Sequence, residues 1–334
     1  MVQSQVIAFS DPMAYQAAVR AADVEILVKS KGHFHAELTR IDLDRLWIQR
    51  GFDSLPRIVR AANDPKRSPI LFLDGVDQSS LLLSGMEVSA GEMVVYSPGA
   101  INHQQTSGPC RWATMSLTPE DLAAAGKAIA GRELTAPSDT LVVRPPPAAM
   151  ARLMALHGAA CHLAKGAPET LAHPRVAKAL EQDLVHAMIA CLAGGASTGS
   201  KSCGRAHAKV VARFEDFLAA KRYEPVYLAE ICAAIGVSER TLRTCCQEHL
   251  GMGPVHYLWL RRMHLARRAL LRGDAITTTV TKVATDFGFW ELGRFSVEYR
   301  ALFGESPSVS LHRPPDGLLD RNRTWSVTLP ILHS

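Results

Sequence analysis

The sequence LAEICAAIGVSERTL, residues 228–242, decides how the C-terminal third of the chain folds. Apolar residues recur at helical spacing up to Ile235. Gly236 then interrupts the helix, because glycine readily adopts the left-handed turn that sets two helices at a steep angle. Ser238 is a favoured N-cap, so a second helix is expected over residues 239–249. The stretch therefore predicts a helix-turn-helix unit.

The same plan occurs a second time further along the chain. A helix predicted over residues 280–287 breaks at a glycine, and another helix is predicted over residues 291–302. Arg243 and Arg294 occupy matching places in the two units. A long predicted helix, residues 254–272, separates the units. A rigid spacer of this kind can hold two reading helices in successive turns of the DNA major groove, roughly 34 Å apart.

At these positions the sequence resembles the AraC/XylS family of bacterial transcription regulators. The matching residues are Leu228, Ile231, Cys232, Gly236, Val237, Ser238, Leu242, Leu250, Gly251, Pro254, Tyr257, Arg261, Leu265, Ala266, Val283, Ala284, Gly288, Phe289, Phe295, Tyr299, Phe303, Gly304, Ser306 and Pro307. The match covers residues 207–313, and residues 288–295 look especially like regulators of the ethanolamine-operon type. The resemblance implies a DNA-binding regulator, most often an activator in this family, with a sensory and dimerising domain attached.

The DNA-reading surface is expected on the polar side of the two second helices. Arginine and glutamine can form paired hydrogen bonds with base edges. The residues expected to contact DNA are Ser238, Arg240, Arg243, Thr244, Gln247, Gly293, Arg294, Val297 and Arg300. Thr244 and Val297 stand where family members often present arginine, and Cys246 stands where the family usually has phenylalanine. Leu292 falls at a DNA-facing family position, although its spacing to Phe295 equally suits the core.

Five arginines of the spacer helix form a run without an acidic neighbour: Arg261, Arg262, Arg267, Arg268 and Arg272. One interpretation is a solvated helix face whose aliphatic stems cover the core. The other is contact with DNA phosphates, which would make Arg267 contribute equally to all DNA sequences.

The N-terminal half carries mostly β signals. Residues 38–49, 69–73 and 93–96 are short apolar or alternating runs separated by turn residues, which favours a barrel or sandwich of antiparallel strands. Between residues 148 and 193 the pattern changes to one apolar helix face, formed by Val176, Leu180, Leu184, Val185, Met188, Ile189 and Leu192. That face can pack on its own domain or on a second subunit.

The chain is therefore predicted to be a multidomain α+β protein. We expect a β-rich sensory domain over residues 1–146, cupin-like if the resemblance extends that far, and a helical dimerisation element over 147–193. A Gly/Ser-rich linker follows over 194–206. The double helix-turn-helix domain spans 207–313, and a polar tail spans 314–334.

Candidate ligand-binding residues of the N-terminal domain are Tyr96, His103 and Trp112, which could line an effector pocket, although aromatic core packing is the simpler interpretation. His33, His35 and Glu37 alternate on one predicted strand face and could bind a metal. They support an alternative function, a cupin-type metal-dependent enzyme with an appended DNA-binding domain. Because no catalytic motif accompanies them, we expect no enzyme activity, no metal and no cofactor.

Composition and charge fit this interpretation. Residues 1–194 hold 18 basic against 19 acidic residues, whereas residues 207–313 hold 15 against 11, so the positive charge lies in the predicted DNA-binding half.

The adjacent pair Cys245 and Cys246 could sense redox state, but small buried residues are more often seen at such positions. The absence of a membrane-spanning or signal segment predicts a cytoplasmic protein. The expected partners are double-stranded promoter DNA, RNA polymerase, a small-molecule effector and a second copy of the chain.

Overall fold

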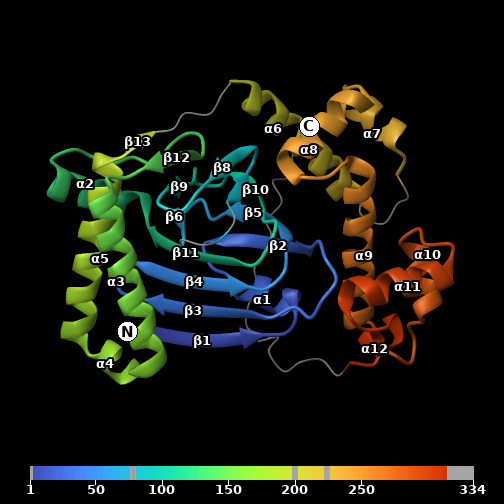
Figure 1. Ribbon diagram of the computed structural model, residues 1–334, viewed down its shortest axis with the longest axis horizontal. Coiled ribbons are helices and arrows are strands. Elements are labelled where there is room, and N and C mark those ends of the chain that lie inside the picture. The colour runs from blue at the N-terminus through green and yellow to red at the C-terminus, as the bar shows by residue number, and fades with distance from the viewer. Residues whose placement is uncertain (1–2, 76–77, 79, 198–201, 222–225, 314–334) are drawn as a thin grey trace, which may run out of the picture.

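A β-rich half and a helical half lie side by side in the computed structural model, which describes residues 3–75, 78, 80–197, 202–221 and 226–313 (Figure 1). The first half ends with two long helices that cover one side of the strands. The second half is built around the long helix α9 (Pro254–Arg272), which runs beside the strands. The predicted fold class, a β-rich N-terminal domain and an all-helical C-terminal domain, is confirmed.

Two antiparallel sheets form the β-rich half. The larger sheet contains, in spatial order, β1 (Gln3–Phe9), β3 (Ala36–Asp42), β4 (Trp47–Asp53), β11 (Cys110–Leu117), β6 (Ser68–Leu73), β9 (Met93–Val95), β12 (Leu141–Arg144) and β13 (Ala196–Ser197). The smaller sheet contains β2 (Ala22–Val28), β5 (Arg57–Asn63), β10 (Ile101–Gln105), β7 (Leu81–Leu83) and β8 (Met86–Val88). The expected antiparallel strands are thus present.

The larger sheet is buried on both faces. Leu38 packs into the cluster shared with the smaller sheet, whereas Ile41 and Ile48 pack into a second cluster shared with helices. The predicted run 38–49 divides into β3 and β4, because the Leu43 N–H donates to the Leu46 carbonyl at 3.0 Å and closes a tight turn. All six residues of β6 are buried, as expected for a strand covered on both sides.

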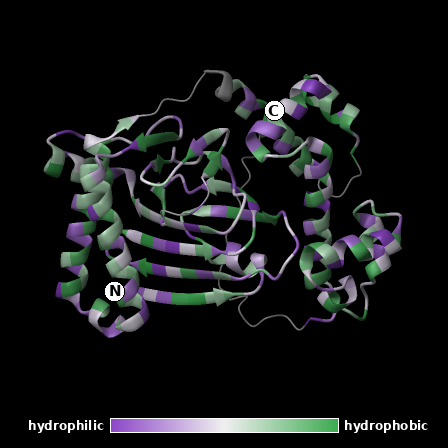
Figure 2. Cartoon of the chain, viewed as in Figure 1, coloured by the Kyte–Doolittle hydropathy of each residue, from purple (hydrophilic) through white to green (hydrophobic). Residues whose placement is uncertain are grey.

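Helices complete the N-terminal half. Their bounds are α1 (Pro12–Ala18), α2 (Pro119–Ala130), α3 (Pro147–Gly166), α4 (Pro168–Ala172) and α5 (Pro174–Gly194). The buried part of the predicted apolar stripe includes Leu184 and Met188, which join the cluster that holds Ile48 of the larger sheet. The stripe therefore packs on its own domain. Figure 2 shows hydrophobic and hydrophilic residues alternating along α3 and α5, as amphipathic helices require.

The C-terminal half matches the predicted helices closely. Besides α9 it contains α6 (Ser202–Ala220), α7 (Leu228–Ile235), α8 (Glu239–Leu250), α10 (Val280–Asp286), α11 (Leu292–Phe303) and α12 (Pro307–Leu311). The bounds of α8, α9, α10 and α11 agree with the predicted ones within one or two residues, whereas the short helix α12 was not predicted. Residues 198–201 of the predicted linker and the predicted tail, 314–334, lie outside the described residues.

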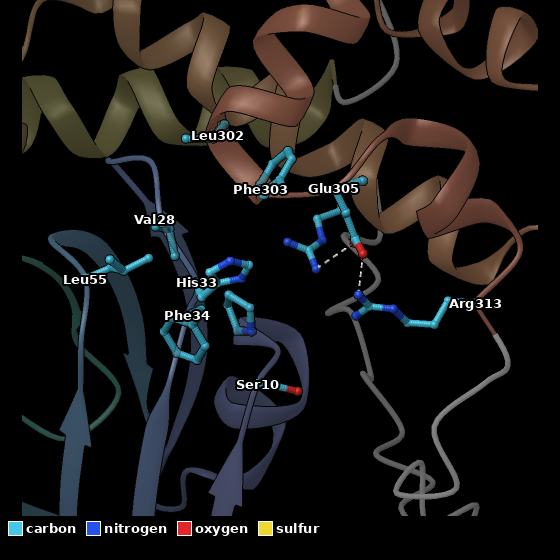
Figure 3. Close-up of a pocket in the computed structure, with 13 residues that line it drawn as sticks. Ser10, Val28, His33, Phe34, Leu55, Leu302, Phe303, Glu305 and Arg313 are labelled. Carbon is cyan, nitrogen blue, oxygen red and sulfur yellow. Dashed lines mark hydrogen bonds and ion pairs between the residues drawn. The ribbon is translucent and has the colours of Figure 1, made fainter.

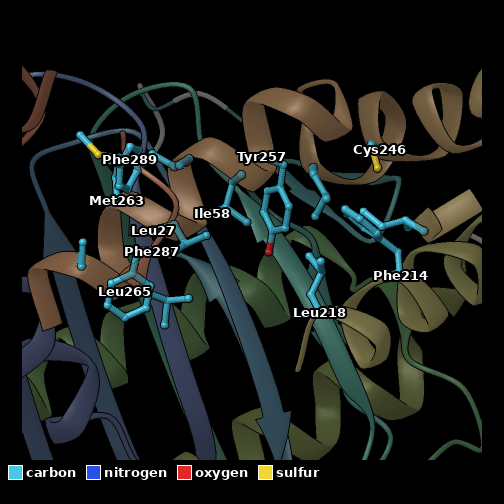
Figure 4. Close-up of a cluster of buried hydrophobic side chains, with 14 of the residues drawn as sticks. Leu27, Ile58, Phe214, Leu218, Cys246, Tyr257, Met263, Leu265, Phe287 and Phe289 are labelled. Atoms are coloured by element: carbon cyan, nitrogen blue, oxygen red, sulfur yellow. The ribbon is translucent and has the colours of Figure 1, made fainter. Parts of the chain in front are cut away.

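The two halves share a hydrophobic core. Leu27 of β2 and Ile58 of β5 belong to the same buried cluster as Tyr257 and Leu265 of α9 (Figure 4). Burial of apolar side chains contributes about 25 cal/mol per Å² removed from water, so this shared core stabilises the docked arrangement. The sequence predicted a flexible connection, and it gave no indication that the halves also associate through their side chains.

Candidate nucleic-acid interface

The first helix-turn-helix unit consists of α7 and α8. Gly236 ends α7 with a φ of +67°, and the Val237 N–H donates to the Cys232 carbonyl at 3.1 Å, which satisfies an orphan carbonyl at the helix end. The Ser238 hydroxyl then accepts from the Thr241 N–H at 3.1 Å and caps α8. The turn and the cap are therefore those that the sequence predicts.

Helix α8 separates buried from exposed residues by face. Its inner face is fully buried and consists of Leu242, Cys245, Cys246 and Leu250. Burial raises the pKa of the Cys246 thiol to about 12, so this side chain behaves as a small apolar residue rather than as a reactive thiolate. The expected DNA contacts of this unit are all exposed: Ser238, Arg240, Arg243, Thr244 and Gln247.

The second unit consists of α10 and α11. Gly288 has a φ of +76°, and the Phe289 N–H donates to the Ala284 carbonyl at 2.9 Å across the turn. Phe295, Tyr299 and Leu302 form the buried face of α11. The expected DNA contacts on the opposite face are exposed: Gly293, Arg294, Val297 and Arg300.

Two exposed apolar side chains distinguish α11 from α8. Val297 is 70% exposed and Leu292 is 37% exposed. Leu292 therefore lies on the side that the resemblance assigns to DNA rather than in the core. Both side chains are thus at least partly exposed to solvent on the helix that carries Arg294.

Arg294 is held by a residue that the sequence analysis missed. Its Nε donates to the Glu298 carboxylate at 2.8 Å, and the indole N–H of Trp259 in α9 donates to the other oxygen of that carboxylate at 2.9 Å. Spacing of four residues between Arg294 and Glu298 is the sequence signal that could have revealed the first contact. No local pattern would have revealed the second.

The arginine run of α9 does not form one DNA-facing surface. Arg267 is buried and donates to Asp11 at 2.9 Å and to Glu305 at 3.3 Å. Arg268 pairs with Glu25 at 3.0 Å. Because its guanidinium is buried in these ion pairs, the expectation that Arg267 contacts DNA phosphates is wrong for this arrangement. Its partner Asp11 lies 256 residues away in the sequence, so no local pattern indicates the pairing.

The remaining arginines of the run divide in the same way. The guanidinium of Arg262 lies over the ring of Phe289 at 5.4 Å, and Arg261 is buried. Arg272 at the end of α9 is exposed. Most of the run thus stabilises contacts between helices and between the two halves.

The three candidate ligand residues of the N-terminal domain do not share one surface. Tyr96 and Trp112 are buried in the cluster between the sheets, where the Tyr96 hydroxyl accepts from Gln104 at 2.8 Å. Trp112 donates from its indole N–H to the Tyr15 hydroxyl at 3.1 Å. His103 adjoins Gln104 on β10 and therefore points to the opposite face of the strand. Burial, followed by the nearby Arg60 and His249, lowers the pKa of His103 to about 3.

The candidate metal ligands also lie apart. His33 and His35 are exposed in the segment before β3, and Glu37 forms an ion pair with Lys165 at 2.9 Å. Within the part of the chain that the structure describes, no group of three or more metal-ligating side chains is gathered. The donor set on which the alternative enzyme function depends is therefore not assembled.

A cavity of about 420 Å³ lies between the two halves near the end of α11. Figure 3 shows Val28, Phe34 and Leu55 on one wall and Phe303 and Glu305 on the other. It contains none of the three residues expected to line an effector pocket. Among the described helices, none combines the length and the apolarity needed to cross a lipid bilayer.

Comparison with known proteins identifies the helical half. A family profile described as a helix-turn-helix domain matches residues 231–313. Over 100 residues the chain is 40% identical to a probable thc operon regulatory protein of Rhodococcus erythropolis. The aligned region covers 30% of each chain. Over 90 residues it is 36% identical to XylDLEGF operon transcriptional activator 2 of Pseudomonas putida, covering 26% of this chain and 57% of that one. The chain thus spans less than two thirds of either relative.

Solved structures give looser alignments. The AraC-like transcriptional activator CuxR aligns over 79% of this chain and 95% of its own, with 16% identity and a TM-score of 0.37. ToxT from Vibrio cholerae aligns over 88% of this chain and 98% of its own, with 11% identity and a TM-score of 0.29. The assignment therefore rests on the profile, the sequence relatives and the two helix-turn-helix units themselves. Together these show that residues 231–313 form a helix-turn-helix domain of the AraC/XylS type.

Proposed function

We propose that the chain is a sequence-specific DNA-binding transcription regulator that reads two successive major-groove segments with α8 and α11. One observation carries the proposal: two helix-turn-helix units, joined by the single helix α9, both leave their polar faces exposed. A recognition helix reads DNA through such a face, because the major groove of B-DNA admits one α-helix and presents a different pattern of donors and acceptors for each base pair.

Different roles are assigned to the residues of each reading face. Arg240, Arg243 and Gln247 carry long side chains that form paired hydrogen bonds with guanine or adenine. The Ser238 and Thr244 hydroxyls are suited to phosphate oxygens or base edges at the helix start. In α11, Arg294 is the base-reading residue, and Arg300 contacts the backbone. Gly293 permits close approach and Val297 contacts a thymine methyl group.

The remaining parts of the protein receive regulatory roles in the same proposal. Residues 1–146 act as the sensory domain for a small-molecule effector, and residues 147–193 act as a dimerisation element. Residues 194–206 connect them to the DNA-binding domain, 207–313. The protein works as a homodimeric activator that contacts RNA polymerase in the cytoplasm, and it is not an enzyme. The relatives named as operon activators support this assignment.

Selection of duplexes from a randomised DNA pool by the full-length chain tests the proposal. We expect enrichment of one motif with two elements. Binding of the Arg243→Ala variant to that motif should be weaker by roughly 1–3 kcal/mol, and the preference at one base position should relax. Arg152→Ala, which removes the same charge from an exposed position in α3, should leave the motif unchanged. Failure of the full-length chain to enrich any motif would overturn the proposal.

A further inference from the structure

We propose that Glu298 and Trp259 set the base specificity of the second unit by fixing the guanidinium of Arg294 for paired hydrogen bonds to a guanine. The inference rests on the proposed function, since it assumes that α11 reads DNA. It assigns positioning roles to one residue of the reading helix and one residue of the spacer helix, neither of which needs to touch a base.

The geometry is a relay between two helices. Arg294 Nε donates to one oxygen of the Glu298 carboxylate at 2.8 Å, and Trp259 Nε1 donates to the other oxygen at 2.9 Å. Arg294 is 67% exposed whereas Glu298 is 28% exposed, so the carboxylate lies beneath the guanidinium and the guanidinium faces outward. Because each carboxylate oxygen has its own donor, the group can neither rotate nor shift without breaking one of the bonds.

The free edge of the guanidinium suits guanine. Nε is occupied by Glu298, and among the described residues none accepts a hydrogen bond from Nη1 or Nη2 of Arg294. Two adjacent N–H groups of arginine match the O6 and N7 acceptors of guanine in the major groove. Adenine presents a donor at the position of O6, so the fixed guanidinium would meet it with an unpaired N–H group.

The relay is anchored in the spacer helix. Trp259 is half-buried against the C-terminal core, and its ring meets the ring of His256 at 5.4 Å. The indole N–H is only a donor, so it favours the ionised form of its partner. In agreement, the hydrogen bond from Arg294, together with that from Trp259, lowers the pKa of Glu298.

Holding the side chain before DNA arrives favours specificity over affinity. A free arginine loses rotamer freedom when it binds, and that cost falls on binding unless another residue has already fixed the side chain. A carboxylate near DNA phosphates opposes binding in general, and it is tolerated only where its arginine is fully paired with the base. An exposed ion pair four residues apart contributes little to helix stability, so the main effect of Glu298 should appear in recognition.

The first unit lacks this relay. Gln247 stands four residues after Arg243, at the place that corresponds to Glu298, and it carries no charge. Within the described part of the chain, no side chain accepts a hydrogen bond from the guanidinium of Arg243. We therefore expect the α8 element of the DNA motif to tolerate more base changes than the α11 element.

Affinity measurements on one duplex and its single-base variants test the inference. The duplex is the motif enriched by the full-length chain, and the variants replace each base pair of the α11 element in turn. In the wild-type chain one guanine should be preferred. Glu298→Ala should reduce that preference about tenfold, because the guanidinium can then adopt other orientations. Trp259→Phe, which keeps the ring and removes the N–H, should reduce it by less.

Two further variants separate positioning from charge. Arg294→Ala should abolish the guanine preference, and adding Glu298→Ala to it should change nothing further, because the carboxylate acts only through the arginine. Glu291→Gln is the matched control: Glu291 is exposed and acts on Arg294 as a nearby charge. It removes the same charge without breaking the relay, and should leave the preference intact.

The remaining outcomes would contradict either this inference or the proposed function on which it rests. If Glu298→Ala behaves as Glu291→Gln should, so that the guanine preference persists and binding changes equally for all duplexes, Glu298 acts only as a nearby negative charge and the inference is wrong. The same holds if the wild-type preference does not depend on Arg294. If the full-length chain enriches no motif at all, the proposed function itself fails.

Discussion

The two helix-turn-helix units contact the N-terminal domain through different chemistry. In the first unit the end of α8 meets β10 and the β7–β8 turn through uncharged groups. A Cβ atom on Gly85 would lie 3.2 Å from the His249 ring, and one on Gly251 would overlap the Gln105 side chain. In the second unit Glu305, which follows α11, joins Arg267 of α9 and Asp11 of the N-terminal domain in buried ion pairs.

This difference shows how each contact can be disrupted. Removal of one member of a buried ion pair leaves an uncompensated charge, which is among the most costly single changes in a protein. A contact between neutral histidine and backbone instead depends on the histidine staying uncharged, and therefore on pH. The second contact should be the more sensitive to substitution. Acid should weaken both, because His249 is buried at the first contact and His264 of α9 is buried beside the second.

The largest effect is expected from Arg267→Ala. The substitution leaves Asp11 and Glu305 buried with less compensating charge, and should lower the free energy of unfolding by about 3–5 kcal/mol. Arg272→Ala removes the same charge from an exposed position on the same helix, and should change stability by less than about 0.5 kcal/mol. Denaturant titration of the full-length chain measures both. Equal stability of the two variants would show that the Arg267 ion pairs do not form.

The next effect is expected from acid. Burial lowers the pKa of His103 to about 3, that of His264 to about 4, and that of His249 in the same direction. Arg60 and His249 add to the effect at His103, and Arg267 and Arg268 add to it at His264, which Glu25 partly opposes. The folded state therefore keeps these rings neutral. Its stability is complete above the unfolded pKa of about 6.5 and declines below it, by about 1.4 kcal/mol per pH unit for His103 and likewise for His264.

Unfolding measured at pH 7.5 and at pH 5.5 checks this expectation. His264→Gln should reduce the loss between the two values by about 1.4 kcal/mol, because one titrating group is removed. His256→Gln, an exposed position on the same helix, should leave the loss unchanged. A chain that gains stability toward pH 5.5, or a His264→Gln variant with the wild-type pH dependence, would contradict the account.

The smallest effect compares two glycines that end the reading helices. Gly251 follows α8 and Gly304 follows α11, both with a left-handed backbone, so alanine is strained at each. A Cβ atom at position 251 would also lie 1.8 Å from Gln105 Oε1, whereas the nearest atom at position 304 is His33 at 3.6 Å. Gly251→Ala should therefore cost about 1 kcal/mol more than Gly304→Ala.

A second substitution separates the clash from the strain. Gln105→Ala in the Gly251→Ala background should recover the excess and leave the backbone strain in place. Thermal unfolding of the wild-type chain and these three variants measures this. If Gly251→Ala and Gly304→Ala unfold at the same temperature, the end of α8 does not rest on β10 as described.

Local patterns predicted the helical half well. The breaks at Gly236 and Gly288 and the cap at Ser238 depend on backbone preferences that act over a few residues, and the structure confirms them. The apolar stripe of α5 was also recognisable from its spacing, although its packing partner was not. Periodicity shows which face of a helix is buried, but it does not show what covers that face.

Local patterns of this kind could not predict contacts between residues that are distant in the sequence. The run that contains Arg267 looked like a solvated or phosphate-binding face because its local neighbours are basic, while its partner Asp11 lies near the start of the chain. The relay from Trp259 to Glu298 joins two helices, and only one of its hydrogen bonds follows helical spacing. His103 was noted as a ligand candidate, but its proximity to His249 arises only when the two halves dock.

The central claim, that α9 holds two reading helices at a fixed separation, is tested by lengthening the DNA between the two elements of the enriched motif. An insertion of about five base pairs rotates the second element by half a helical turn, to the opposite side of the duplex. If both units engage one face of the DNA, the full-length chain should lose tight binding to the lengthened duplex, and an insertion of about ten base pairs should not restore it, because the spacer cannot lengthen. Unchanged affinity after the half-turn insertion would contradict the claim, and would mean that only one of the two units reads DNA.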